Sequence, residues 1–543
     1  MAIGAKQRKK GRMRCPRTLV LGAGWLLAGC GRSTEPAPPA TRLAPVTGSA
    51  SAQAAPQPRA TGRDRVTLDG AFHAPSAPRE EREQPRVYAK ALRAWIQARP
   101  TPSSERLGYL RAGSSSAAAG PVGTEGCSGG WYGVQPEGFV CVGPTATLDA
   151  RDATVALSSL GPVSFARKLP YIYGTVRNPG PVYARLPTQA ELAEAEPDLA
   201  ERMPAWLGAS GEIGASYAQD VWLGQPGVVP DPSEAWASRR SDAVPDLLRR
   251  GASARLTDTG TAEGSALVLG KMRPKVGYSF LSTFLFEGRR YGLASDLSLI
   301  PTDRLRPIRG SEFHGVELGG AVKLPFAFMR RDGARFWRFD RKSNKLEDAG
   351  PAPYRSVVAL SGKRQFFRGR LHDETSDGLY VSDQDASRID PAKRMPAWGK
   401  NGERWLDVNL SKQTLVAYDG ERPVFATLVS SGEAGLDDAE TSTATKRGIF
   451  RIHTKHVSST MSSDEVGEEF ELRDVPYVQY FEKGYALHGA YWHDRFGTPK
   501  SHGCINLAPE DARRLFSFTE PALPEGWHGV LAARTGTVVF IHP

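Results

Sequence analysis

The sequence has few of the residues that build a disulfide scaffold, since only five cysteines occur among 543 residues. It contains no run of 18 apolar residues, so it lacks the pattern of an ordinary membrane-spanning helix. HExxH and CxxC motifs are absent. Gly264–Met272 fails as a phosphate-binding loop, because five residues separate its glycines where four are needed. We therefore predict neither a metal site nor an organic cofactor.

The formal net charge of +11 would suit a nucleic-acid-binding protein. Residues 1–29, however, contain seven cations and no acid, and without them the excess falls to +4. Because the charge is concentrated in this short segment, we predict no nucleic-acid partner and interpret the basic segment as part of a targeting signal. Its cations are Lys6, Arg8, Lys9, Lys10, Arg12, Arg14 and Arg17.

The apolar stretch that follows these cations is too short to span a bilayer but fits a secretory signal peptide over residues 1–29. Its last residues and the next one, Leu27-Ala28-Gly29-Cys30, resemble a bacterial lipobox. The resemblance implies cleavage before Cys30, acylation of its sulfur, and anchoring in a lipid membrane on the side of the periplasm or cell wall. Gly31 would favour the outer membrane in a Gram-negative cell. The alternative is an ordinary signal peptide followed by an incidental cysteine.

Residues 30–85 are rich in Ala, Pro, Ser and Thr and show no apolar periodicity, which predicts a flexible tether. About 55 residues of such coil span roughly 40 Å. A tether of this length suits a target some nanometres from the membrane, such as the cell wall.

Two β-rich regions are predicted next. Residues 86–150 alternate short aromatic and β-branched runs with glycine-rich turns, and they loosely resemble a bacterial SH3-like module. In an oxidising compartment, Cys127 and Cys141 are expected to form a disulfide there, although two free thiols are the alternative. Residues 151–398 also read as mainly β, with a helix over Gln189–Met203 and a hairpin turn at Glu287-Gly288, and their role stays open.

The reactive side chains gather near the carboxyl terminus, where seven of the ten histidines and the last cysteine lie. His488-Gly489 is followed by eleven residues and then by Ser501-His502-Gly503-Cys504-Ile505-Asn506. A thiol is mostly protonated at pH 7, and only the thiolate is a good nucleophile. A histidine beside Cys504 would take that proton.

The spacing of these residues suits a β framework. We expect strands at Pro476–Phe481 and Tyr485–His488, then a loop over Ala490–Lys500 that returns the chain and brings Cys504 beside His488. A helix should start at Pro509, because proline suits the first helical position and acids follow it. The backbone N–H groups of Gly503 and Cys504 could then hold a developing oxyanion.

The pattern His-Gly-x11-Ser-His-Gly-Cys-Ile-Asn resembles the signature of the L,D-transpeptidase catalytic domain (the YkuD-like domain). Trp405–Leu410 with Gln413–Tyr418 resembles its opening hairpin, and Thr445–Ile452 resembles a further strand. The fold class implied is mainly β: a YkuD-like, β-sandwich-type catalytic domain over residues 399–543, with one main helix, preceded by SH3-like and other β-rich modules.

The resemblance also implies a mechanism. Cys504 would attack the bond before the terminal D-alanine of a peptidoglycan tetrapeptide stem, forming a thioester that an amine of a second stem or a protein resolves. His488 would be the base, oriented by the Gly489 carbonyl, with His502 and Gly503 shaping the oxyanion site. The other predicted positions are Ser501 and Asn506 in the loop, and Tyr477, Tyr480 and Trp492 in the donor groove or in the core. Carbapenem β-lactams are the inhibitors implied.

Other interpretations remain open. With water in place of the amine, the protein would be an L,D-carboxypeptidase or wall hydrolase with the same site. A lipid-anchored wall-binding protein with a silent site is an alternative from another class, and so is a buried thiol beside a structural histidine. A zinc site would have to use His453, His456, His488, His502 and Cys504, without a second cysteine at ligand spacing.

Overall fold

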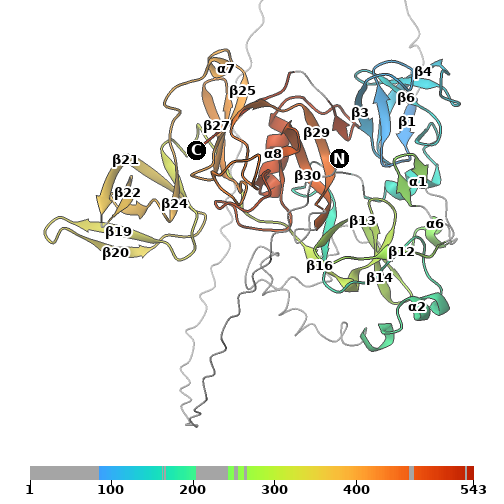
Figure 1. Ribbon diagram of the computed structural model, residues 1–543, viewed down its shortest axis with the longest axis horizontal. Helices are drawn as coiled ribbons and strands as arrows, with labels where there is room; N and C mark the ends of the chain where they lie inside the picture. The colour runs from blue at the N-terminus through green and yellow to red at the C-terminus, as the bar shows by residue number, and fades with distance from the viewer. Residues whose placement is uncertain are drawn as a thin grey trace, which may run out of the picture. The chain divides into compact units, whose positions relative to one another are not determined.

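The computed structural model describes residues 85–543, except 162, 164, 166, 203–242, 250–254, 262–265, 368, 464–469 and 532–534. The predicted signal peptide, Cys30 and nearly all of the tether lie outside the described residues. The described part belongs to one compact unit, Glu81–Pro543. Among the described residues, no helix has both the length and the apolar character needed to cross a membrane. Most of the elements are strands, as the sequence predicts (Figure 1).

The first group of strands builds a small core between residues 86 and 147. Its buried side chains include Val87, Ile96, Leu110 and Val140. The pairs are β1–β4, β1–β7, β2–β3, β2–β6, β4–β5 and β5–β6. The bounds are β1 Arg86–Ala89, β2 Ala94–Gln97, β3 Arg106–Leu110, β4 Ser115–Gly123, β5 Trp131–Val134, β6 Phe139–Cys141 and β7 Ala146–Thr147.

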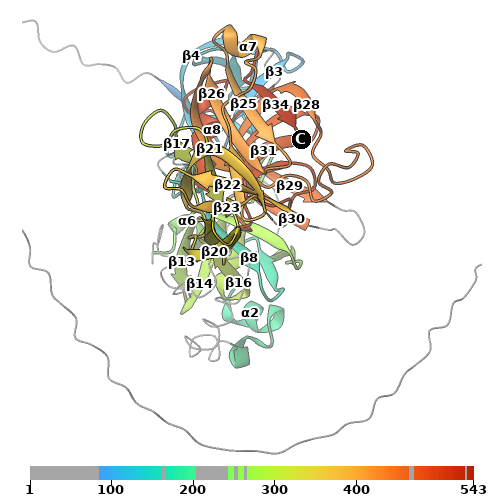
Figure 2. The ribbon, with the colours of Figure 1, turned by 90° about the vertical axis from the view of Figure 1, so that its left-hand side faces the viewer.

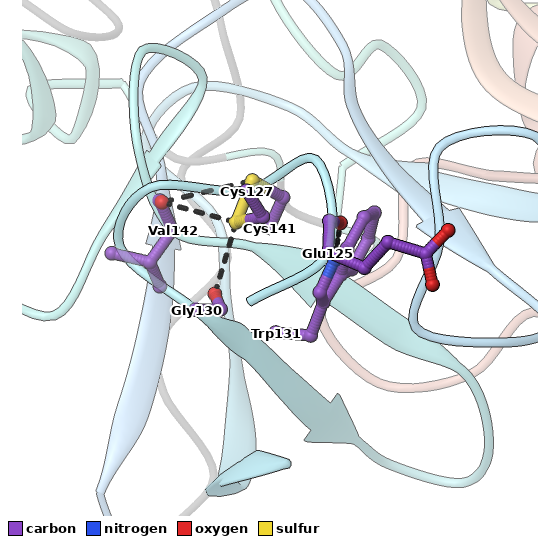
Figure 3. The surroundings of a disulfide bond; sticks show 6 residues. All are labelled: Glu125, Cys127, Gly130, Trp131, Cys141 and Val142. Carbon is purple, nitrogen blue, oxygen red and sulfur yellow. Dashed lines mark hydrogen bonds between the residues drawn. A yellow bond between two sulfur atoms is a disulfide. The ribbon is translucent and has the colours of Figure 1, made fainter. Parts of the chain in front are cut away.

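A disulfide joins Cys127, just before β5, to Cys141 at the end of β6, with the two Cα atoms 5.7 Å apart (Figure 3). The indole N–H of Trp131 donates to the carbonyl of Glu125 at 2.7 Å and holds the same loop from its other side. The covalent link and the indole together fix the turn that leads into β5.

The next sheet runs in the order β16-β8-β13-β14-β15-β9-β12. Its predicted hairpin is present, since Glu287 and Gly288 both have positive φ in the turn between β13 and β14. The strands are β8 Ile172–Val176, β9 Pro181–Tyr183, β12 Val268–Lys271, β13 Val276–Phe286, β14 Arg289–Ala294, β15 Leu299–Pro301 and β16 Leu305–Ile308. Around it lie α1 Ala153–Ser158, α2 Gln189–Ala195, α6 Asp246–Arg249, η2 Thr302–Arg304 and the short pair β10 Leu256–Thr257 and β11 Gly260–Thr261.

The helix predicted over Gln189–Met203 is interrupted in the structure: residues 199–202 are helical, but α2 ends at Ala195. Pro197 follows, and proline cannot continue a helix hydrogen-bond ladder. The carboxylate of Glu196 instead turns inward to Arg289 at 2.7 Å and to Arg304 at 2.6 Å. A buried ion network around Glu196 therefore marks the break between the two helical stretches.

A second sheet of seven strands occupies residues 326–389, in the order β20-β19-β23-β22-β21-β18-β24. An aromatic contact between Phe339 and Phe367, with ring centroids 4.9 Å apart, joins its two long hairpins. The strands are β18 Phe326–Met329, β19 Arg335–Asp340, β20 Lys345–Pro351, β21 Val357–Phe367, β22 Arg370–Thr375, β23 Tyr380–Ser382 and β24 Ala386–Ile389. The short helix α7, Ala397–Lys400, leads to the last part of the chain.

The carboxyl-terminal part has two sheets that share a core with helix α8, Pro509–Phe518. One sheet has the order β17-β27-β26-β25-β34-β28. The other joins β32, β31, β30, β29 and β33. Their bounds are β17 Val316–Glu317, β25 Arg404–Asn409, β26 Thr414–Asp419, β27 Arg422–Leu428, β28 Gly448–Arg451, β29 Thr454–Ser463, β30 Phe470–Glu482, β31 Tyr485–Gly489, β32 Ile505–Leu507, β33 Gly529–Val530 and β34 Val538–His542.

Helix α8 starts at Pro509, as predicted, with Glu510 and Asp511 in its first turn. Its buried face of Ala512, Leu515 and Phe516 packs in the core with residues of both sheets, such as Val408 and Leu487. Figures 1 and 2 show the helix beside the strands of this part of the chain. Each large apolar side chain buried here contributes about 1.5–3 kcal/mol.

The second of these sheets is extended by strands from earlier in the chain. β3 pairs antiparallel with β33, and Gly108 meets Val530 in that pair. A side chain at Gly108 would not fit, since its Cβ would lie 2.2 Å from the carbonyl oxygen of Gly529. β13 pairs in parallel with β30. The strands that carry the predicted site are therefore backed by residues far away in sequence.

Asp474, a buried carboxylate in β30, ties these parts together. It lies 2.6 Å from a guanidinium nitrogen of Arg111 and accepts hydrogen bonds from the hydroxyls of Ser279, Ser295 and Ser458. Burial alone would raise the pKa of Asp474, but the Arg111 charge and the hydroxyls outweigh it and lower the pKa to about 2. Asp474 is therefore ionised at neutral pH and depends on Arg111.

Replacing Arg111 with methionine should destabilise the protein by about 3–5 kcal/mol, because it leaves the buried Asp474 carboxylate without its cation. Urea unfolding followed by tryptophan fluorescence would measure the loss. Arg93→Met is the matched control, since Arg93 pairs with Asp258 at 2.8 Å but both side chains are largely exposed; it should cost less than about 1 kcal/mol. Equal midpoints for the two variants would contradict the role of Asp474.

Candidate active site

The pairing of two parallel strands brings the predicted catalytic residues together. In β31 and β32, Leu487 is opposite Ile505 and His488 is opposite Asn506. Cys504 directly precedes β32, so its register partner is Ala486, and the backbone N–H of Ala486 interacts with its sulfur. Because side chains alternate along a strand, Cys504 and Asn506 share the face on which His488 lies.

His488 is almost fully buried, at 2% exposure. Its Nδ1 lies 3.3 Å from the Gly489 carbonyl oxygen, and a carbonyl can only accept, so Nδ1 carries the proton. Burial lowers the pKa of His488 to about 4, although the Gly489 carbonyl opposes the shift. At neutral pH the imidazole is therefore uncharged, with Nε2 free of a proton and able to act as a base.

The Cys504 thiol is the only free cysteine among the described residues, and it is partly exposed. It donates to the carbonyl of Gly484 with a sulfur–oxygen distance of 3.7 Å. Its apolar surroundings raise the pKa of the thiol to about 11. Since the neighbouring imidazole is neutral, the resting pair is a thiol and an uncharged base rather than a thiolate and an imidazolium.

This resting state predicts the pH dependence of alkylation. The rate of reaction of Cys504 with iodoacetamide should keep rising between about pH 7 and pH 10, because the thiolate fraction grows up to a thiol pKa of about 11. Mass spectrometry of the labelled protein over time measures the rate at each pH. A rate that is already constant above pH 7 would show a preformed thiolate–imidazolium pair and contradict the prediction.

The turn before Cys504 is held by hydroxyl groups. Ser501 donates from Oγ to the carbonyl of Cys504 and accepts the N–H of Gly503 at 3.1 Å. Thr445 donates to the Gly503 carbonyl at 2.8 Å. Gly503 has φ of +122°, and a Cβ there would lie 2.8 Å from the ring of Tyr485. The position therefore requires glycine, and its N–H is engaged inside the turn.

The loop is also anchored from behind by a histidine. The Nε2 atom of His493 lies 2.9 Å from the side-chain nitrogen of Asn506. The Nδ1 atom of His493 accepts a hydrogen bond from the backbone N–H of Arg495 at 3.2 Å. Both His493 and Asn506 are buried. The sequence analysis gave no role in the site to Thr445 or His493. The signal that could have identified them is their position, because Thr445 begins the family-like segment Thr445–Ile452 and His493 lies in the loop between the two parts of the signature.

The structure separates the aromatic residues predicted for a donor groove. Tyr477 is fully buried, and its hydroxyl donates to the carbonyl of Arg167 at 3.0 Å, so the groove assignment is wrong for this residue and it belongs to the core. Tyr480 and Trp492 are partly exposed, and the Trp492 ring lies 5.7 Å from that of His488. His502 is exposed and lies 5.2 Å, ring to ring, from Phe470.

The histidines of the zinc alternative are not gathered around one point. His456 Nδ1 lies 3.1 Å from the hydroxyl of Tyr109, and His453 Nδ1 lies 2.9 Å from the hydroxyl of Thr454. Within the described part of the chain, no group of three or more His, Cys, Asp or Glu side chains is placed to hold a metal ion.

The model of the L,D-transpeptidase catalytic domain, YkuD, matches residues 403–541. Comparison with curated proteins finds no match. Solved structures that resemble the chain include an Enterococcus faecium L,D-transpeptidase C442S mutant, with 21% identity over 26% of this chain and 50% of that one and a TM-score of 0.20. The chain thus matches about half the length of that protein.

Two further solved structures each align with 39% of this chain. An L,D-transpeptidase from Mycobacterium smegmatis has 16% identity over 84% of its own length, with a TM-score of 0.21. A complex of LdtMt1 with imipenem has 15% identity over 82% of its length, with a TM-score of 0.20. The match of the family model includes every residue of the β31–β32 site, so residues 403–541 of this chain are similar to the catalytic domain of the L,D-transpeptidases.

Proposed function

We propose that the protein is a peptidoglycan L,D-transpeptidase with Cys504 as its nucleophile. The observation that supports this most is the register of β31 and β32, which puts the only free described thiol on the same face as a neutral, oriented imidazole. A thiol with a raised pKa and a base with a lowered one suit a proton transfer that occurs as the substrate is attacked.

In the first half-reaction, His488 Nε2 takes the thiol proton while the sulfur attacks the carbonyl before the terminal D-alanine. The negative charge that develops on the carbonyl oxygen is stabilised by the backbone N–H of Cys504. The N–H of Gly503 is a weaker candidate, since Ser501 already accepts it. The carbon–nitrogen bond then breaks, the imidazolium returns its proton to the leaving amine, and D-alanine departs from a thioester.

In the second half-reaction, an amine of another stem or of a protein attacks the thioester. His488 takes a proton from that amine, the carbon–sulfur bond breaks, and the thiol is restored with a new amide in place of the old one. Water in the position of the amine would instead give an L,D-carboxypeptidase. The walls contributed by Tyr480 and Trp492 decide between the two by how well they exclude water.

The test is mass spectrometry of disaccharide–tetrapeptide muropeptides incubated with the full chain. Cross-linked dimers together with free D-alanine are expected for transfer. Tripeptides without dimers would identify a hydrolase, and unchanged muropeptides would contradict both activities and favour a silent site.

Carbapenem β-lactams should acylate the same sulfur. After incubation with imipenem, the protein should gain the mass of one drug molecule, and peptide mapping should locate it on Cys504, because the strained lactam carbonyl replaces the peptide carbonyl of the donor. Cys504→Ser is the control. A drug adduct elsewhere, or none at all, would contradict the proposed nucleophile.

We also propose that the protein is exported and anchored through acylated Cys30, with residues 30–85 as a tether. The support is the basic and apolar pattern of residues 1–29 and the sequence Leu27-Ala28-Gly29-Cys30. Cells given a labelled fatty acid should label the wild-type protein and not Cys30→Ala; equal labelling would contradict the anchor.

A further inference from the structure

A cavity of about 680 Å³ lies apart from the Cys504 site. Its walls come from the β3–β4 turn, the end of α1, the segment around Tyr171, and residues near Trp527. None of the described residues that line it is His488, His502 or Cys504. The volume lies in the range of about 300–1,000 Å³ that small-molecule sites occupy.

One polar side chain in the wall of the cavity is buried but makes no hydrogen bond to the described residues. Ser158, at the end of α1, is 3% exposed, and its hydroxyl has no hydrogen-bond partner among the described residues. Leaving a buried hydroxyl unpaired costs about 1–3 kcal/mol, and such groups in native proteins usually have a partner. Because Ser158 lines the cavity, its partner should be a polar group of whatever fills that cavity.

The described residues that line the cavity include the aromatic side chains of Phe165, Tyr171, Phe516 and Trp527. Tyr171 and Trp527 are each 5% exposed, and both line the cavity. Phe165, which is 39% exposed, stacks on Phe516 with centroids 6.1 Å apart. Ring faces beside short hydroxyl side chains suit a ligand that has both C–H surfaces and hydroxyl groups.

The charges around the cavity balance. Arg111 is neutralised by Asp474 at 2.6 Å, and the described lining residues include one further cation, Arg86, and one acid, Glu525. Arg86 donates two hydrogen bonds to Ser115, from Nε at 3.0 Å and from a terminal nitrogen at 3.1 Å, and keeps further N–H donors available. This balance disfavours a polyanion and favours an uncharged polar ligand.

We propose that this cavity binds an N-acetylated hexosamine unit of the peptidoglycan glycan strand. This rests on the proposed function, since it assigns a second contact with the same polymer. The sugar rings would pack on Tyr171 and Trp527, while Ser158 and Arg86 would hydrogen-bond to hydroxyl or acetamide groups. Strand β30 connects the two sites, because Asp474 supports Arg111 at the cavity and Tyr480 lies beside Cys504.

The experiment is a titration of the full chain with tri-N-acetylchitotriose, followed by isothermal calorimetry and by the intrinsic fluorescence that Trp527 contributes. Saturable binding is expected for the wild type. Ser158→Ala and Arg86→Met, tested separately, should each weaken it by about tenfold, which corresponds to about 1.4 kcal/mol. Arg93→Met, a cation outside the cavity, and Cys504→Ala should both bind as the wild type does.

Absence of saturable binding, or equal affinity in wild type, Ser158→Ala and Arg86→Met, would overturn the proposal. Turnover of disaccharide–tetrapeptide muropeptides by the wild-type chain, measured beside sugar binding, separates the two hypotheses. Turnover without sugar binding overturns the glycan site and leaves the transpeptidase intact. Sugar binding without turnover has the opposite meaning: the cavity is a glycan site, and the catalytic proposal fails.

Discussion

Cys504→Ala should lower the rate of cross-link formation by at least about a thousandfold, because no other group in the proposed mechanism can form the thioester. The fold should hardly change, since the sulfur is partly exposed and its hydrogen bond to the Gly484 carbonyl is long, at 3.7 Å. We expect an unfolding free energy within about 1 kcal/mol of the wild type. Dimer formation from muropeptides and urea unfolding measure the two quantities.

A serine in the same place gives a second comparison. Cys504→Ser keeps a hydroxyl of similar size, but an alcohol is a much poorer nucleophile than a thiolate without a strong base, and the uncharged His488 with its pKa of about 4 is a weak one. We therefore expect Cys504→Ser to be nearly as inactive as the alanine variant. Full activity in either variant would remove Cys504 from the mechanism.

His488→Gln should reduce kcat/KM by roughly 10²–10⁴-fold, the usual contribution of a general base. Glutamine can still donate to the Gly489 carbonyl, which His488 contacts at 3.3 Å, so the strand should remain in place while the proton acceptor is lost. The residual activity should rise with pH, because hydroxide then has to generate the thiolate. The measurement is kcat/KM between about pH 6 and pH 10.

The matched control is His372→Gln. His372 is also buried, and its Nδ1 also lies close to a backbone carbonyl, that of Arg370 at 3.2 Å, but it belongs to the sheet of residues 326–389. It should lose some stability and keep its turnover. If both histidine variants lose activity to the same degree, the effect of His488→Gln is a general folding effect and not the loss of a base.

Several elements of the fold follow from local sequence signals. Pro509 with two acids after it predicts where α8 begins, and Glu287-Gly288 predicts the turn between β13 and β14. In each case the decisive interaction is short-range, such as a fixed proline φ, a helix dipole, or a turn that needs positive φ. The strands predicted at Pro476–Phe481 and Tyr485–His488 likewise lie within β30 and β31.

Strand β30 has two features that local sequence signals could not predict. Asp474 and Tyr477 have φ of +48° and +58°, so the alternation of side chains is broken there and six residues in succession, from Asp474 to Gln479, are buried. Alternation could not show that Tyr477 faces the core. Nor could it show the partner of Asp474, because Arg111 lies 363 positions earlier in the chain.

The protonation states of Cys504 and His488 could not be predicted from the sequence either. The same two residue types can rest as an ion pair or as neutral groups, and burial decides between these states. A signature names the nucleophile and the base, but the apolar surroundings that raise the pKa of Cys504 and lower that of His488 come from packing.

The position of β34 in its sheet has a consequence for how the strands of the candidate site are supported. β34 lies between β25, with which it is parallel, and β28, although both partners precede it in the chain. Val539 and Ile541 of β34 lie in the same core as Leu487 of β31 and Ile505 of β32. The support of the strands beside the candidate site therefore depends on a strand that contains none of the predicted site residues.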